Sequence, residues 1–399
     1  MAFVSYDTVH ARPADARGEP GAAGDVSVVE GSAGIAALEP AWREIAAAAR
    51  DEAVFLSFGY ALAAARYHEA RGERVAAALV EWAGRPACLL AVAVVRRTGA
   101  RIAVALGDPV TQYSDVLIAR TAPTRLADVA LRAIAARGAI DLFEFRRTRG
   151  DSALTPALVR LSASSVETRE APFADLTAED DAQSLLLRIA GAKHKRERAR
   201  SRRRLGERGA LAFEVFRGAA AVDPLAEAFR TKAARLARSG LFSPVIDDPN
   251  ALALLQAAAR DPEDGAAVVV ARLTVGGAAA AYEVGLVRGG RFHAYLGAVD
   301  DAFAGASPGK VVMEETFCWA KARGLGVYDL LPPGDRYKRE WSTGAVTTRD
   351  FLAPATLRGR LYAGPWLKRV RPALRDALRR MPPPLRRLAT RAAVAVGIR

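Results

Sequence analysis

The chain has 399 residues, of which 51% are apolar and 26% charged, and its formal net charge is +14. This is the composition of an ordinary soluble protein, and the length predicts two domains rather than one. It argues against a membrane-spanning protein, because no apolar run approaches the ~20 residues that a span needs. The four histidines and two cysteines also lack the spacing of a metal site.

The positive charge is concentrated in two segments. Residues 193–208 hold nine Lys or Arg against two Glu, and residues 357–399 hold twelve against one Asp. The rest of the chain is therefore slightly acidic, unlike a nucleic-acid-binding protein that is basic throughout. The N-terminus has no hydrophobic signal segment, so the sequence predicts a cytoplasmic protein.

The two halves of the chain predict the same order of elements. After a segment expected to be disordered, 1–24, the patterns predict a helix at 54–70, strands at 74–97 and 100–109, a helix at 126–138 and a strand at 139–145. The second half predicts a helix at 251–261, strands within 266–299, a helix at 311–323 and a strand at 326–331. In each half the triplet Ala-Arg-Gly ends the second helix, and the strand after it carries an acid, Glu144 or Asp329.

This repetition predicts an internal duplication of an α/β unit. We expect an α/β (α+β) fold with two tandem domains, each a mixed sheet flanked by helices, at residues 25–175 and 210–356. A basic linker helix at 176–209 joins them, and a basic tail follows at 357–399. The first half is expected to lack an anion-binding turn, with residues 107–116 as the corresponding loop.

Residues 177–209 read as one helix that is acidic at its start and rich in arginine later, an order that complements the helix dipole. Four cations recur at intervals of three and four residues and so share one face: Lys193, Arg196, Arg200 and Arg203. Like charges on one stripe repel each other, so this face predicts an anionic ligand or partner. An ordinary solvated face is the alternative.

The segment GASPGKVVMEETFCWAKARG, residues 305–324, predicts a turn followed by a helix. Ser307 suits the N-cap and Pro308 the first helical position. It is not an ATP-binding P-loop, because its two glycines are one residue too close and Val311 stands where a hydroxyl is needed. The first turn would direct backbone N–H groups and Lys310 at an anion, the alternative being a plain capped helix.

Residues 291–341 contain a recognisable series: Tyr295, Asp300, Phe303, Ser307-Pro308-Gly309, Gly324, Tyr328-Asp329, Tyr337-Lys338 and Trp341. By this series the segment resembles the BioF2-like acetyltransferase family of the GNAT superfamily, which includes CelD or cellulose-biosynthesis proteins. The arginine-rich helix and residues 40–46 and 54–63 match as well, so the similarity covers about residues 27–352. The family is similar in turn to the FemABX transferases, which have two fused GNAT-like domains.

The resemblance implies transfer of an acyl group from acyl-CoA, with acetyl-CoA expected, to an amine or hydroxyl acceptor without a metal. It also implies a role in cell-surface polysaccharide or envelope biosynthesis. GNAT proteins hold the pyrophosphate of coenzyme A at a helix N-terminus after a glycine-rich turn. This assigns donor binding to Ser307, Gly309, Lys310 and Val311, although Pro308 departs from the usual signature by removing an N–H donor.

Catalytic roles follow from the same resemblance. Lys338 matches the lysine that in FemABX proteins faces the substrate phosphate and the developing oxyanion, with a surface lysine as the alternative. Asp329 is the candidate to orient the acceptor or act as base, with a structural acid as the alternative, and Tyr337 is the candidate acid for the leaving thiolate. Residues expected to meet the acceptor are Arg196, Arg200, Arg203, Asp300, Glu283 and Trp341, of which Asp300 and Glu283 are also weaker candidates for the base.

Two other functions remain open. One is a FemABX-like transferase that uses aminoacyl-tRNA and binds it with the basic helix. The other is a non-catalytic scaffold of a polysaccharide synthase. The scaffold would attach through the basic tail, whose apolar residues recur at helical spacing between arginines: Leu367, Val370, Leu374, Leu378 and Met381. This pattern, with Trp366 at its edge, predicts peripheral contact with an anionic membrane at the inner face, the alternative being a helix that packs on the body.

Overall fold

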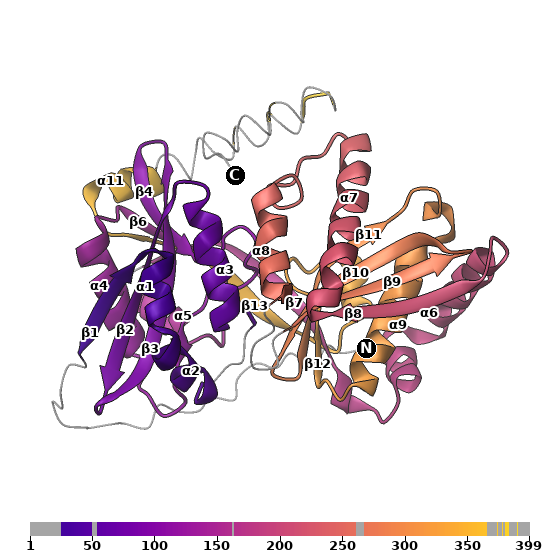
Figure 1. The fold of residues 1–399 in the computed structure, drawn as a ribbon, viewed down its shortest axis with the longest axis horizontal. Helices are drawn as coiled ribbons and strands as arrows, with labels where there is room; N and C mark the ends of the chain where they lie inside the picture. Colours follow the sequence, from indigo (N-terminus) through magenta and orange to yellow (C-terminus); the bar gives the residue numbers. More distant parts are fainter. Residues whose placement is uncertain are drawn as a thin grey trace.

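The computed structural model describes residues 25–49, 54–161, 163–260 and 267–364, with isolated positions further on. Within these residues the strands form one mixed 13-stranded sheet in the order β1-β2-β3-β4-β6-β13-β7-β12-β11-β10-β9-β8, and β5 pairs with β3 off this path. Helices cover both faces of the sheet (Figure 1). The segment 1–24 and the predicted tail helix lie outside the described residues.

The first half of the chain, on the left of Figure 1, supplies one end of the sheet. Its strands are β1 (Val26–Glu30), β2 (Arg74–Trp82), β3 (Arg85–Arg97), β4 (Ala100–Ala105), β5 (Leu117–Ile118), β6 (Leu142–Arg149) and β7 (Ser164–Asp175). Its helices are α1 (Gly31–Ala37), α2 (Glu39–Ala47), α3 (Phe58–Glu69), α4 (Leu126–Gly138) and α5 (Leu154–Arg160).

The second half, on the right, supplies the other end. Its strands are β8 (Leu211–Arg217), β9 (Ala267–Val275), β10 (Ala278–Arg288), β11 (Arg291–Val299), β12 (Val327–Asp329) and β13 (Gly344–Pro354). Its helices are α6 (Ala182–Gly206), α7 (Val222–Arg238), α8 (Pro249–Arg260), α9 (Pro308–Ala322), α10 (Arg336–Arg339) and α11 (Leu357–Leu361).

The predicted duplication is confirmed by the strand pairing. In each half four strands run antiparallel, β1 to β4 and β8 to β11, and a fifth, β6 or β12, is parallel to the fourth. Equivalent two-residue turns join equivalent strands: Ala83-Gly84 matches Gly276-Gly277, and Thr98-Gly99 matches Gly289-Gly290. Both residues of each turn have positive φ, which is the geometry that gives a tight hairpin the twist of its strands.

The two halves exchange their last strands. β7 follows the first half in the chain but pairs with β12 of the second, and β13 follows the second half but pairs with β6 of the first. β7 and β13 also pair with each other along nearly their whole length. The boundary expected at residue 175 therefore does not divide the sheet, because each unit needs a strand from beyond that point.

The central strands of the second half are buried on both faces. Alternate residues of β9 point to opposite sides, so that Val268 and Val270 pack with α7 and α8 while Val269 and Ala271 pack on the side of α9. This double coverage explains the nearly continuous apolar runs in these strands.

The basic linker differs from the single helix expected at 177–209. α6 contains a break at Gly191, whose φ of 75° and ψ of 171° are not helical. It also packs along α9 rather than standing free. The tail likewise begins inside the fold, since a Cβ at Gly359 would lie 1.8 Å from the Asp141 carbonyl oxygen and Tyr362 is buried. Within the described residues, no helix is long and apolar enough to cross a membrane.

Candidate active site

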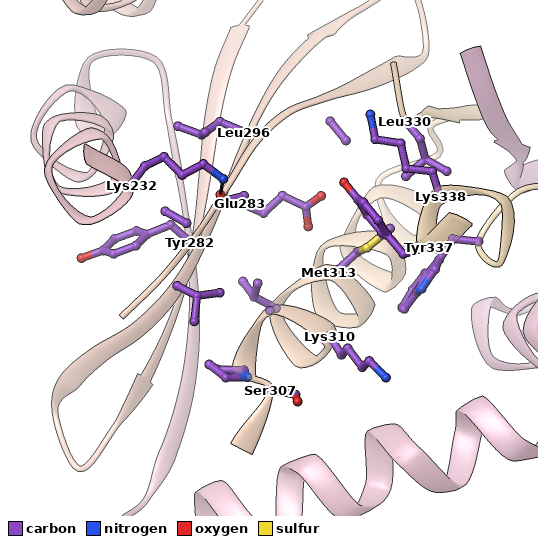
Figure 2. A pocket seen from close by; sticks show the side chains of 18 of the residues that line it. Lys232, Tyr282, Glu283, Leu296, Ser307, Lys310, Met313, Leu330, Tyr337 and Lys338 are labelled. Carbon is purple, nitrogen blue, oxygen red and sulfur yellow. Dashed lines mark hydrogen bonds between the residues drawn. The ribbon is translucent and has the colours of Figure 1, made fainter. Parts of the chain in front are cut away.

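A cavity of about 580 Å³ lies in the second unit between β10, β11 and the start of α9, with further walls from α6, α7 and α10. Of the residues expected to form the site, those lining it are Glu283, Ser307, Gly309, Lys310, Tyr337, Lys338 and Trp341. Figure 2 shows Glu283, Tyr337 and Lys338 gathered at one end, and Ser307 and Lys310 at the other, where α9 starts. The structure thus brings together residues spread over almost 60 positions of sequence.

The cavity forms where two parallel strands separate. β11 and β12 pair from Arg291 to His293 and diverge beyond that point, and the rest of β11, from Ala294 to Val299, lines the cavity. The register between β10 and β11 shifts at Val284 and Gly285, which leaves Tyr295 as an extra, bulged residue. The edge of β11 that β12 leaves open can therefore pair with an extended ligand through backbone hydrogen bonds.

The start of α9 fits an anion less simply than the sequence predicts. Ser307 occupies the N-cap position, but it is left-handed (φ 55°) and its side chain does not cap the helix. Pro308 has no backbone N–H, and the backbone N–H of Lys310 donates to the Ser307 carbonyl at 3.1 Å. The N–H of Gly309 is therefore the main backbone donor that the turn can offer an anion. A Cβ at Gly309 would lie 3.1 Å from Val299 Cγ2, so a side chain here would crowd the end of β11.

Lys310 is half exposed, and its Nζ lies 2.8 Å from Glu197 of α6. Val311 is fully buried and packs in the core behind the cavity, so only its backbone can serve the donor site expected for it. In the first unit the segment directly before α4 is Ala122-Pro123-Thr124-Arg125, not the expected loop 107–116. The first half of the chain therefore has a proline and a cation, Pro123 and Arg125, at the positions of Pro308 and Lys310. It has Thr124 where α9 has Gly309.

Glu283 has the properties of a general base. It lies in β10, is 6% exposed, and its Oε1 accepts a hydrogen bond from the Tyr328 hydroxyl. Among the described residues its buried Oε2 has no hydrogen-bond partner. Burial raises the pKa of Glu283 to about 7, although the hydrogen bond from Tyr328 acts in the opposite direction. A carboxyl group that titrates near neutral pH can accept a proton from a substrate.

Asp329 lies outside the cavity, in contrast to the expectation that it serves as base. It is 1% exposed, and its Oδ1 accepts hydrogen bonds from the Tyr113 hydroxyl and the Leu331 N–H, both at 2.9 Å. Its Oδ2 lies 3.2 Å from Arg291 and 3.5 Å from Arg149. Both carboxylate oxygens of Asp329 are thus bonded to groups from the two halves of the chain. Asp329 therefore fits the alternative expectation, that of a structural acid.

Lys338 is held in the cavity wall by the same loop. It is 9% exposed, and its Nζ donates to the Leu331 carbonyl at 2.8 Å. Burial lowers the pKa of Lys338, while the charges of Asp335 and Asp329 act in the opposite direction. Since Leu331 is bonded to Asp329 through its N–H and to Lys338 through its carbonyl, Asp329 positions the lysine.

Tyr337 and Trp341 frame the same end of the cavity. The side chain of Tyr337 is directed toward Glu283 in Figure 2, and Tyr337 is half exposed. Trp341 is buried, with its ring edge-on to Phe317 and the guanidinium carbon of Arg198 5.2 Å from its ring centroid. The tryptophan thus closes the cavity on the side of α6.

The arginine stripe expected on the basic helix does not reach the cavity. The four cations that were expected to share the stripe are all exposed: Lys193, Arg196, Arg200 and Arg203. The inward face instead carries Arg198, Ser201 and Leu205, all buried. Asp300 also lies outside the lining, in the turn after β11, where its Oδ1 accepts from the Ala302 N–H at 2.8 Å.

Sequence reasoning missed several lining residues. The apolar Leu205, seven positions after Arg198, was the available signal for the inward face of α6. Lys232 of α7 gave no signal, yet its Nζ donates to the Gly297 carbonyl at 2.9 Å and burial lowers its pKa. Tyr282 and Tyr295 line the cavity only because of the strand register. In the described part of the chain, no group of three or more His, Cys, Asp or Glu is placed to hold a metal ion.

Comparison with known proteins places this cavity within a recognised domain. Residues 192–339 match the family model described as Acetyltransferase (GNAT) domain. The second half of the chain is thus similar to a GNAT acetyltransferase domain. The matched residues include the basic helix, α9 and the catalytic candidate Lys338. No curated protein matches the chain.

Solved structures are similar in fold at low sequence identity. The C-terminal domain of a protein described as a lysylphosphatidylglycerol synthetase from Agrobacterium fabrum aligns with a TM-score of 0.51 and 14% identity, covering 82% of this chain and 95% of that one. FemX aligns with a TM-score of 0.50 and 10% identity, covering 74% and 91%. A conserved protein of unknown function from Bacteroides thetaiotaomicron aligns with a TM-score of 0.50 and 12% identity, covering 79% and 97%. These alignments span both units, so the two-unit fold recurs as a whole.

Proposed function

We propose that the protein transfers an acyl group from acyl-CoA to an amine or hydroxyl acceptor. The observation that carries the proposal is the cavity between β11 and α9, in which an open strand edge, a helix start and a carboxyl group with a pKa of about 7 meet. The family match of residues 192–339 supports acyl transfer as the reaction class.

The start of α9 would hold the phosphates of the donor. Gly309 offers its N–H without a side chain in the way, and Lys310 adds a positive charge beside it. The cavity as a whole is cationic, since the charged side chains that line it include Arg198, Lys232, Arg235, Lys310 and Lys338 against two carboxyl groups, Glu283 and Glu340. The extended arm of the donor would then pair with the open edge of β11.

The chemistry follows from the groups at the other end. Glu283 takes the proton of the acceptor amine or hydroxyl as its nitrogen or oxygen attacks the thioester carbonyl. Lys338 stabilises the negative charge that develops on the carbonyl oxygen. The carbon–sulfur bond then breaks, Tyr337 gives its proton to the thiolate, and the proton held by Glu283 restores the Tyr337 hydroxyl. The products are the acylated acceptor and free coenzyme A.

The pathway rests on the resemblance of residues 291–341 to BioF2-like and CelD proteins, which supports cell-surface polysaccharide or envelope biosynthesis. A second candidate is an aminoacyl-tRNA-dependent transferase of the FemABX type. The exposed Arg196, Arg200 and Arg203 on α6 favour it, because a row of exposed cations suits a nucleic-acid backbone. The two candidates predict different donors.

The donor is tested by calorimetry with acetyl-CoA and longer acyl-CoAs, and by filter retention of aminoacyl-tRNA. Gly309→Glu is expected to abolish acyl-CoA binding, because the carboxylate would stand where the phosphates lie. Gly305→Glu is the matched control, since a Cβ at Gly305 meets nothing within 4 Å and Gly305 does not line the cavity. Wild-type protein that binds no acyl-CoA, or equal binding by wild type and Gly309→Glu, would contradict the proposal. Retention of aminoacyl-tRNA alone would favour the second candidate.

A further inference from the structure

Arg198 is a buried cation with unmet hydrogen-bonding capacity. It lies on the inward face of α6, is 2% exposed, and lines the cavity. Its Nε donates to Glu314 of α9 at 2.9 Å, whereas Nη1 and Nη2 are buried and have no hydrogen-bond partner among the described residues. A guanidinium carries five N–H donors, so most of its capacity is unused.

The neighbouring acid does not meet this demand. Glu314 turns its other oxygen to Arg202, which binds it through Nε at 3.2 Å and Nη2 at 2.7 Å. Trp341 covers one face of the Arg198 guanidinium and offers no acceptor. Leaving a charged donor buried and unpaired is unfavourable, so an anion beside Nη1 and Nη2 would be stabilised.

Arg198 lies further along α9 than the first turn of that helix. Its partner Glu314 lies seven residues beyond Ser307, roughly 10 Å along the axis of α9 at 1.5 Å per residue, and one turn beyond Lys310, which pairs with Glu197 next to Arg198. Arg198 of α6 and Trp341, which follows α10, contact each other and line the same cavity as Lys338 and β11. This is the side from which an acceptor would approach a thioester held along β11.

We propose that the acceptor carries an anionic group, a carboxylate or a phosphate, which Arg198 binds through its two terminal nitrogens. The planar pair of Nη groups matches two oxygens of either anion. The proposal rests on the proposed function for the meaning of donor and acceptor, but the anion site itself is independent of it. Arg198 is then the residue that selects charged acceptors over neutral ones.

The test is calorimetry on the full chain with inorganic phosphate and with acetate as probes, each with and without saturating acetyl-CoA. Arg198→Lys keeps the charge and one contact to Glu314 but lacks the paired nitrogens, and is expected to weaken binding of the probes by about 10- to 100-fold. Arg202→Gln is the matched control, because Arg202 shares Glu314 on the same helix but does not line the cavity. It is expected to bind the probes like wild type.

Each outcome decides the proposal. Binding that persists with acetyl-CoA present and is lost in Arg198→Lys supports an acceptor site. Phosphate displaced by acetyl-CoA, together with weaker acetyl-CoA binding in Arg198→Lys, would assign Arg198 to the donor and overturn it. Absence of probe binding, or equal loss in Arg202→Gln, would also overturn it. If Arg198→Lys does not fold, a crystal structure of the wild type with phosphate decides, and an anion bound away from Arg198 contradicts it. Failure of acetyl-CoA alone to bind would reject the proposed function and leave the anion site standing.

Discussion

Replacing Glu283 by glutamine is expected to remove the general base while keeping the shape of the cavity. Positioned general bases contribute about a hundred- to ten-thousandfold to rate, so turnover should fall by that factor. Acyl-CoA binding should be unchanged, because Glu283 lies at the other end of the cavity from the start of α9. Release of free thiol from acetyl-CoA, followed against pH, measures the effect.

The pH dependence adds a sharper signature. The pKa of Glu283 is about 7, so wild-type kcat/KM should fall as the pH drops below about 7 and the base becomes protonated. Tyr328→Phe removes a hydrogen bond that lowers this pKa, so the acidic limb should move to higher pH. In Glu283→Gln this limb should disappear.

Stability should respond in the opposite sense to activity. The pKa of Glu283 is higher in the folded protein than in the unfolded chain. Protonated Glu283 therefore contributes to the free energy of unfolding below pH 4.5, and this contribution is lost as the pH rises through about 7. The difference corresponds to about 3 kcal/mol at most. Between pH 4.5 and pH 8, wild type should therefore lose more unfolding free energy than Glu283→Gln, as measured by urea denaturation. Parallel stability curves together with an unchanged rate profile would refute the assignment of Glu283 as a buried base.

Lys338→Ala should lower turnover by about a hundredfold or more and leave the acetyl-CoA dissociation constant unchanged, since a charge facing the oxyanion acts mainly in the transition state. An effect on KM alone would make Lys338 a binding residue. Asp329→Asn removes a charge that raises the pKa of Lys338, so the alkaline limb of the kcat–pH profile should shift to lower pH, and an unshifted limb would limit Asp329 to folding. Full-length protein should bind anionic vesicles at low salt and dissociate at high salt, each basic residue near the surface contributing about 1 kcal/mol. A chain ending at residue 364, chosen because Tyr362 is buried, should stay folded and not bind; equal sedimentation of both forms with vesicles would exclude the tail as a membrane anchor.

The duplicated architecture could be predicted from the sequence because its determinants are local. Tight hairpins need residues that tolerate positive φ, and the pairs Gly276-Gly277 and Gly289-Gly290 indicate such hairpins in the sequence. The apolar runs of β9 and β10 and the proline-glycine start of α9 likewise act within a few residues. The cavity-lining residues in α10 were recognised through the resemblance to a known family, and those at the start of α9 through that resemblance and the local turn pattern.

The chemical roles depended on contacts between distant segments. Glu283 resembles any acid in a strand, and its pKa is set by burial among residues such as Tyr328, 45 positions away. Asp329 resembles a catalytic acid at a strand end, but its carboxylate accepts a hydrogen bond from Tyr113, which lies 216 positions earlier in the chain.

The direction of the basic helix was decided in the same way. Like charges at helical spacing describe two faces of α6 equally well; Leu205 marks the inward face, and packing against Glu314 holds Arg198 there. The exchange of β7 and β13 also has no local signal, because a strand's pattern of burial does not specify its partner. The sequence by itself thus determined the elements and the place of the cavity, whereas tertiary packing decided which charges are buried and therefore which can act.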